Sequence, residues 1–233
     1  MIKKQIPNTL TCLNLLSGML GIYFVLEGNI NFGAYFIFIA ALFDFLDGFL
    51  ARILKVNSEI GKELDSLADL VTFGVLPSFV LFKMINQNAT LGYLPFFVFI
   101  VGIFSAIRLA KFNVDTRQSD RFIGLPTPAH ALLISTLPFL TARFPEMTQI
   151  LNLPYFIMGL ALLLSFLLVS ELPLIALKFE NFRIKDNLFR YLTLLTGIVC
   201  ILAFGLAGIP FVIISYIVLS VMEGLLTKNA KIN

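Results

Sequence analysis

The chain has 233 residues, of which 58% are hydrophobic and 13% are charged, and its mean hydropathy is +0.93. So apolar a composition excludes an ordinary soluble domain, because several stretches approach or exceed the roughly 18–20 apolar residues of a membrane-spanning helix. The formal net charge of +3 does not indicate nucleic-acid binding, since membrane topology alone accounts for the basic residues. We therefore expect a protein that contacts the lipid bilayer and no nucleic acid.

The apolar stretches predict an all-α, polytopic integral membrane protein with about eight transmembrane helices. The predicted spans are residues 9–28, 30–52, 64–85, 92–112, 127–144, 153–171, 189–207 and 209–226. No linker, charge block or internal repeat divides them, so we expect a single membrane domain over residues 1–233. The first span lacks a short apolar region followed by a small-residue cleavage site, and we expect it to be retained.

Lys and Arg positions predict how the helices are oriented. With both termini in the cytoplasm, only Lys83 and Arg143 of the 17 Lys and Arg residues face outwards. The cytoplasmic residues are Lys3, Lys4, Arg52, Lys55, Lys62, Arg108, Lys111, Arg117, Arg121, Lys178, Arg183, Lys185, Arg190, Lys228 and Lys231. We therefore expect a multi-pass protein of the inner (cytoplasmic) membrane with both termini in the cytoplasm.

The end of the second span carries a stripe of acidic and small residues: Asp44, Asp47, Gly48, Ala51 and Arg52. At about 100° per residue, they share one helix face about 140° wide. The two carboxylates, three residues apart, can share one ion. Glycine and alanine let a bulky ligand approach the backbone, and the planar guanidinium suits a phosphate.

The start of the third span carries a complementary stripe, with Gly61, Asp65 and Asp69 spaced four residues apart. The connection between these spans is short, so the two helices should be antiparallel neighbours. Four carboxylates would then meet at the cytoplasmic end of the bundle, at a cost of about 10 kcal/mol if nothing neutralised them. An oxygen-rich pocket of this kind suits hard cations such as Mg²⁺ or Mn²⁺.

Metal, small residues and an arginine in one pocket indicate a phosphate-bearing ligand and group transfer. Asp69, the last of its stripe, is the expected base that takes a proton from an attacking hydroxyl. A metal-cation transporter is the alternative, because acidic residues in membrane helices also form ion sites. A transport path needs further polar groups, and the predicted spans of the second half contain only Glu171, Arg190 and Glu223.

Residues 44–69 resemble the signature of the CDP-alcohol phosphatidyltransferases, D-x-x-D-G-x-x-A-R, eight residues, then G-x-x-x-D-x-x-x-D. Every fixed position is filled, and the spacer from Ile53 to Ile60 has the right length. The resemblance implies transfer of a phosphatidyl or related group from a CDP-linked donor to an alcohol, with release of CMP. It also implies two metal ions held by Asp44, Asp47, Asp65 and Asp69, Asp69 as the base, and a homodimer.

Three further segments resemble the membrane-embedded phosphatidylserine synthase branch of this family. They are Pro7–Gly18, Arg108–Asn113 and Phe122–Ala131, although this chain has His130 where that branch usually has a small residue. The match covers about residues 5–131, the expected catalytic core, and leaves additional helices at about 153–226. This resemblance implies CDP-diacylglycerol as donor and L-serine as acceptor.

The sequence also predicts residues for two binding sites. The expected CDP-binding residues are Asn8, Thr11, Asp44, Gly48, Ala51, Arg52, Gly61 and Asp65. For Asn8 and Thr11, hydrogen bonds that only join helices are an equal alternative.

The expected acceptor-binding residues are Arg108, Lys111, Asn113, Gly124 and Pro126. The two basic side chains could bind the carboxylate of serine or a phosphate, and the topology rule alone also explains them. Glycerol 3-phosphate or an inositol phosphate is the alternative acceptor. Either would require more basic residues at the pocket, for which only Arg117 and Arg121 remain.

Overall fold

The computed structural model describes residues 2–56, 58–85, 91–115, 122–175, 181–184 and 186–230. Of the residues that the sequence analysis named, Arg117, Arg121, Lys178, Lys185 and Lys231 lie outside these ranges. The side chains of Lys3, Lys4 and Lys228 are likewise not described.

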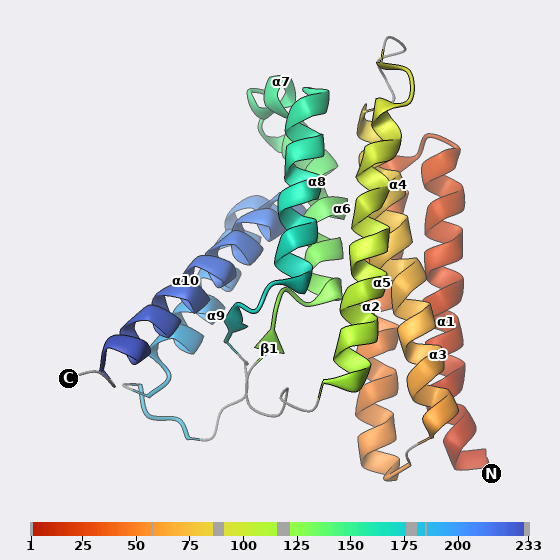
Figure 1. Ribbon diagram of the computed structural model, residues 1–233, viewed down its shortest axis with the longest axis vertical. Coiled ribbons are helices and arrows are strands. Elements are labelled where there is room, and N and C mark those ends of the chain that lie inside the picture. Colours follow the sequence, from red (N-terminus) through yellow and green to blue (C-terminus); the bar gives the residue numbers. More distant parts are fainter. Residues whose placement is uncertain are drawn as a thin grey trace.

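The described residues form a helical bundle (Figure 1). The α-helices are α1 (Ile2–Leu26), α2 (Ile30–Leu54), α3 (Glu59–Asp69), α4 (Leu76–Ile85), α5 (Ile100–Val114), α6 (Thr127–Arg143), α7 (Met147–Leu151), α8 (Pro154–Val169), α9 (Leu188–Phe204) and α10 (Ile209–Ala230). A π-helical segment, Leu70–Val75, joins α3 to α4, and 3₁₀ turns occupy Leu94–Phe99 and Gly205–Gly208. Two short strands, β1 (Phe122–Ile123) and β2 (Pro173–Leu174), pair antiparallel.

The prediction of an all-α polytopic membrane protein is confirmed. Four helical stretches are long and apolar enough to cross a membrane: Gln5–Leu26, Glu59–Ile85, Leu94–Val114 and Leu188–Leu226. The last contains two of the predicted spans, α9 and α10, and Pro154–Val169 is a shorter apolar helix. Each of the eight predicted ranges coincides with a helical segment, while a count of eight crossings stays a prediction.

The helices sort into two groups in space (Figure 1). Helices α1 to α5 stand side by side, and α1 packs along α2, α3 and the π-helical segment. Helices α9 and α10 lean away at the other side of the molecule, with α6 and α8 between the two groups. The hydrophobic core includes Phe73, Leu76 and Ile134, which are fully buried where the π-helical segment, α4 and α6 meet.

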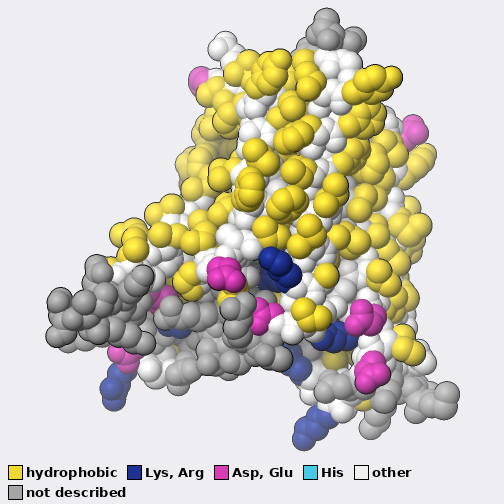
Figure 2. Space-filling model, in the orientation of Figure 1, with side chains coloured by type: hydrophobic (Ala, Val, Ile, Leu, Met, Phe, Trp, Pro, Cys, Tyr) yellow, Lys and Arg dark blue, Asp and Glu magenta, His cyan; other side chains and the backbone are white. Residues whose placement is uncertain are grey.

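Apolar and charged side chains occupy different ends of the molecule (Figure 2). Hydrophobic side chains cover most of the face shown, and Lys, Arg, Asp and Glu gather towards one end. Both chain termini lie towards that same end (Figure 1). The broad apolar band is the surface expected of a protein embedded in lipid.

The turn between α2 and α3 is built by local signals at both helix ends. Lys55 adopts the left-handed conformation (φ 50°), and its N–H bonds back to the last turn of α2. The Ser58 hydroxyl then accepts a hydrogen bond from the Gly61 N–H and caps α3. Such caps satisfy the free backbone groups at helix ends, so α3 begins close to where α2 stops.

Candidate active site

Helices α2 and α3 bring three of the four predicted carboxylates together. Asp44, Asp47 and Asp65 each offer an oxygen, and these atoms lie within 4.8 Å of one another. Asp47 is buried, whereas Asp44 and Asp65 are partly exposed. A cluster of three carboxylates this close is unfavourable unless a cation shares it.

The donor atoms fit a hard divalent cation. Asp65 Oδ1 is buried and has no hydrogen-bond partner among the described residues, as expected of an atom whose partner is an ion. Carboxylate oxygens are the ligands that such cations prefer. No Cys or His belongs to this cluster of described residues.

Asp69 stands one helical turn beyond Asp65 and is held differently. It interacts electrostatically with Asp44 and Asp65, and the Asn14 amide nitrogen donates to its Oδ1 at 3.1 Å. Only 8% of Asp69 is exposed. The carboxylate expected to act as the base therefore has a fixed orientation beside the cluster of three carboxylates.

Helix α1 contributes one polar side chain per turn to this site. The Thr11 hydroxyl donates to Asp47 Oδ2 at 2.7 Å, and Asn14 donates to Asp69. Asn8 lies against Gly61, where an added Cβ would come within 2.9 Å of Asn8 Oδ1. The three residues of this series thus contact α2 and α3 at positions of the predicted motif.

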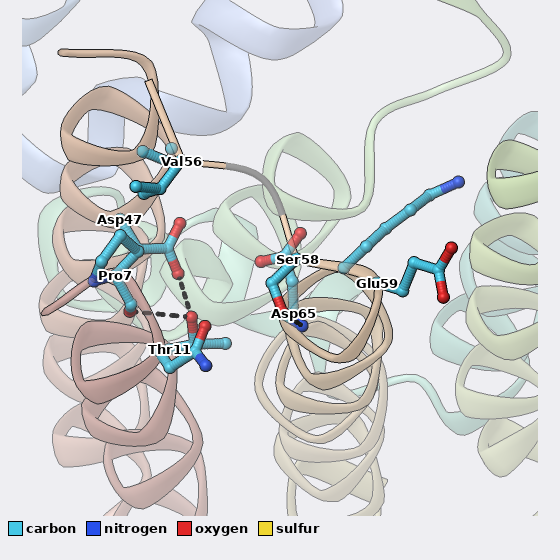
Figure 3. Close-up of a pocket in the computed structure, with 12 residues that line it drawn as sticks. Pro7, Thr11, Asp47, Val56, Ser58, Glu59 and Asp65 are labelled. Carbon is cyan, nitrogen blue, oxygen red and sulfur yellow. Dashed lines mark hydrogen bonds between the residues drawn. The ribbon is translucent and has the colours of Figure 1, made fainter. Parts of the chain in front are cut away.

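These elements enclose a pocket of about 550 Å³ between α1, α2 and α3. Figure 3 shows Thr11 and Asp47 on one side of the pocket, and Ser58, Glu59 and Asp65 on the other. Six of the eight predicted CDP-binding residues line it: Asn8, Thr11, Gly48, Ala51, Gly61 and Asp65. Asp47, predicted as a metal ligand, lines it as well.

The other two predicted CDP-binding residues, Asp44 and Arg52, do not line this pocket among the described residues. Asp44 belongs to the carboxylate cluster. Arg52 is exposed, and its Nε donates to the Gly48 carbonyl of the same helix at 3.0 Å.

Two of the predicted acceptor residues line a second pocket. Arg108 and Lys111 line a separate pocket of about 350 Å³, together with Asp115, Ser170 and Glu171. Arg108 is only 6% exposed, and its Nε is buried without a hydrogen-bond partner among the described residues. A buried cation with an unused donor is a suitable contact for an anionic group.

The other three predicted acceptor residues make structural contacts. Asn113 donates to the Ser66 hydroxyl at 2.9 Å and thereby ties α5 to α3. Gly124 has φ +77°, and its N–H bonds to the Leu172 carbonyl. Pro126 precedes the first turn of α6. None of the three lines either pocket among the described residues.

Sequence reasoning missed Lys62 as a site residue. Lys62 lines the aspartate pocket, and its Nζ bonds to the Asn113 carbonyl at 2.9 Å. This places one cation between the two pockets. Its spacing of three residues before Asp65 was visible in the sequence, but the topology rule already explained a basic residue there.

Comparisons with known proteins agree with this geometry. Residues 4–177 match the model of the CDP-alcohol phosphatidyltransferase family. A CDP-diacylglycerol–serine O-phosphatidyltransferase of Helicobacter pylori is 33% identical, over 78% of this chain and 75% of its own length. The protein of the same description from Bacillus subtilis is 39% identical, over 58% of this chain and 76% of its own. An archaetidylserine synthase of Methanothermobacter thermautotrophicus is 34% identical, over 61% of each chain.

Proposed function

The chain belongs to the CDP-alcohol phosphatidyltransferase family, and we propose that it transfers the phosphatidyl group of CDP-diacylglycerol to the hydroxyl of L-serine. The products are phosphatidylserine and CMP. The acceptor is supported by relatives that are described as acting on serine. The observation that carries the chemistry is the cluster of Asp44, Asp47 and Asp65 beside Asp69.

In this proposal the pocket between α1, α2 and α3 binds the CDP head group. Asn8 and Thr11 line it from α1, and Gly48, Ala51 and Gly61 leave space for the ligand at the backbone. Arg52, at the exposed end of α2, is proposed to reach the nucleotide phosphates by leaving its contact with Gly48. The acyl chains remain among the apolar helices, so the donor is bound without leaving the membrane.

The four aspartates are proposed to hold two divalent cations, Mg²⁺ or Mn²⁺. Bound there, the metals would neutralise the pyrophosphate and the charge that grows on the leaving CMP. Asp69 takes the proton from the serine hydroxyl, whose oxygen forms a bond to the phosphatidyl phosphorus. The bond from that phosphorus to the oxygen of CMP breaks, and CMP carries away the electron pair.

The pocket lined by Arg108 and Lys111 is proposed to bind the carboxylate of the acceptor. Asn113, Gly124 and Pro126 support it indirectly, because they fix the end of α5 and the turn before α6. Lys62, which lies between the pockets, connects the two parts of the site.

The protein is further proposed to sit in the inner (cytoplasmic) membrane as a homodimer, with both termini and the active site on the cytoplasmic side. The family resemblance supports the dimer. The distribution of Lys and Arg supports the orientation, since residues of this kind are retained on the cytoplasmic side.

The experiment that tests the function is CMP release by the purified protein in detergent. CDP-diacylglycerol and Mg²⁺ or Mn²⁺ are supplied with L-serine, glycerol 3-phosphate or an inositol phosphate in turn. We expect CMP only with L-serine, and none after the metal is chelated. Release with a phosphorylated alcohol instead would overturn the acceptor, and release without metal would overturn the role of the carboxylate cluster.

A further inference from the structure

Asn14 is the least exposed polar residue of the α1 series and touches the proposed base directly. Its side chain is 0% exposed, and its Nδ2 donates to Asp69 Oδ1 at 3.1 Å. A hydrogen bond from an amide to a carboxylate oxygen fixes the direction of both groups. Oδ1 of Asp69 thereby faces Asn14, and Oδ2 is the oxygen proposed to take the proton of the acceptor.

A second contact fixes the backbone around Asn14. The Thr72 hydroxyl, on the π-helical segment that follows Asp69, donates to the Asn14 carbonyl at 3.2 Å. Gly18, one turn further along α1, allows this approach, because an added Cβ would lie 3.0 Å from the Thr72 Cα and would collide with its hydroxyl. Asn14 and Asp69 are therefore held together by their side chains and by the helices that carry them.

The amide oxygen of Asn14 is left without a donor. Asn14 Oδ1 is buried and has no hydrogen-bond partner among the described residues. Exchanging the oxygen and nitrogen of the amide would not remedy this, since two acceptor oxygens would then face each other at Asp69. Buried polar groups nearly always have a partner, so a ligand with an N–H or O–H group would complete this site.

We propose that Asn14 recognises the amino group of the acceptor, with Oδ1 accepting a hydrogen bond from its ammonium. This rests on the proposed function, because the hydroxyl and ammonium of serine are on neighbouring carbons. Where Asp69 receives the proton of the hydroxyl, the ammonium must lie beside Asp69, and the Asn14 amide is there. An ammonium has three donors and no acceptor, so it complements a free amide oxygen. A site built to hydrogen-bond one group of a substrate rejects analogues that lack the group.

The test compares L-serine with 3-hydroxypropanoate, which is the same molecule without the amino group. The KM for L-serine and the inhibition constant of 3-hydroxypropanoate are measured by CMP release for the wild type and for Asn14→Leu. We expect the KM for L-serine to rise about ten- to a hundredfold, the range for a lost hydrogen bond to a charged group. The inhibition constant of 3-hydroxypropanoate should stay within about threefold, because it never used this contact.

A second variant separates recognition from alignment of Asp69. Asn14→Asp keeps acceptor oxygens for the ammonium but has no N–H for Asp69. We expect the KM for L-serine to stay within about threefold and kcat to fall at least about tenfold. Ser17→Ala is the matched control, because Ser17 is a buried polar residue of the same helix whose hydroxyl donates to the Leu13 carbonyl of that helix. Its kinetic constants should be those of the wild type.

Several outcomes would overturn the inference. One is an unchanged KM for L-serine in Asn14→Leu, and another is an equal rise in the KM and in the inhibition constant of the analogue. If Asn14→Leu does not fold, a tenfold rise in the KM for L-serine in Asn14→Asp would also overturn the inference. A wild type that releases no CMP with L-serine would instead contradict the proposed function, so the two failures are distinguishable.

Discussion

The Thr11 hydroxyl joins α1 to the carboxylate cluster. It lies 2.7 Å from Asp47 Oδ2 and 3.1 Å from the Pro7 carbonyl, and Thr11 is 3% exposed. A hydroxyl has a single proton, so only one of these oxygens can receive it at a time. The charged carboxylate is the stronger acceptor, which makes Thr11 a support for a proposed metal ligand.

Replacing Thr11 with Val should therefore weaken metal binding. The change removes the hydroxyl and keeps the shape of the side chain, and loss of a group that supports a metal ligand typically lowers affinity or activity about 10–100-fold. The measurement is the Mg²⁺ or Mn²⁺ concentration that gives half-maximal CMP release. Thr9→Val is the control, since Thr9 is exposed and its hydroxyl donates to the Gln5 carbonyl of its own helix. An unchanged metal requirement with a raised KM for CDP-diacylglycerol would assign Thr11 to the nucleotide instead.

Replacing Asp69 with Asn should abolish turnover and preserve the fold. The amide has nearly the same shape, but it cannot take the proton of the attacking hydroxyl, a contribution of about 10²–10⁴-fold. We expect kcat for CMP release at saturating Mg²⁺ or Mn²⁺ to fall by at least about 100-fold. A kcat within tenfold of the wild type would contradict the role of Asp69 as base.

At the scale of elements, Gly124 fixes the connection between α5 and α6 against the end of α8. Its backbone has φ +77°, and an added Cβ would lie 2.7 Å from the Leu168 carbonyl oxygen and 2.9 Å from that of Ser170. Both obstacles are backbone atoms, which cannot move aside as a flexible side chain can. Only glycine fits this position, so β1 and β2 can pair beside the pocket of Arg108.

Gly124→Ala should destabilise the protein for two reasons. The left-handed conformation costs about 1–2 kcal/mol for a residue with a Cβ, and the collision with the two carbonyls adds to it. We expect the thermal midpoint in detergent to fall by about 4–8 °C. Gly92→Ala separates the two causes, because Gly92 has φ +55° with nothing within 4 Å of an added Cβ. Equal losses in both variants would show that the close contacts at Gly124 do not matter.

The sequence predicted the helices and the acidic motif better than the connections between helices. Apolar length and a spacing of three or four residues are local properties, so they locate α1 to α6 and place Asp65 and Asp69 on one stripe. Pairing of β1 with β2 depends on backbone hydrogen bonds between residues about fifty positions apart, which no local pattern indicates. The sequence also does not indicate that Arg108 lies in a different pocket from the aspartates. That separation depends on how α5 packs against α3 and α8.

The π-helical segment after Asp69 was also beyond sequence reasoning. Pro77 was visible in the sequence, and it has no N–H for the Phe73 carbonyl four residues earlier. How the chain accommodates that loss depends on tertiary contacts: the fully buried His130 of α6 lies against the Phe73 carbonyl. The extra residue of a π-helix changes which faces of α3 and α4 are aligned. The predicted span 64–85, taken as one uninterrupted α-helix, therefore gives the wrong rotation of α4 relative to α3.

At the scale of the whole molecule, the charge distribution is the strongest argument for orientation. Charged side chains gather at the end where both termini lie (Figures 1 and 2). At the other end of α1, the Lys83 ammonium donates to the Leu26 carbonyl at 2.7 Å. A lysine at the carboxyl end of a helix satisfies a free carbonyl and the helix dipole. Lys83 thus has a local structural reason to lie on the predicted outer side despite the topology rule.

This orientation can be tested by labelling single cysteines in intact cells. In a background with Cys12→Ala and Cys200→Ala, the exposed residues Asn29, Glu146 and Glu59 are each replaced by Cys. Asn29 precedes α2 and Glu146 precedes α7, on the predicted outer side, whereas Glu59 begins α3 beside the aspartate pocket. We expect a membrane-impermeant thiol reagent to label Asn29→Cys and Glu146→Cys in intact spheroplasts, and Glu59→Cys only after permeabilisation. The labelling of Glu59→Cys in permeabilised cells is the control for its reactivity. The reverse pattern would place the active site outside, away from a cytoplasmic supply of CDP-linked donor and serine, and would contradict the proposed orientation.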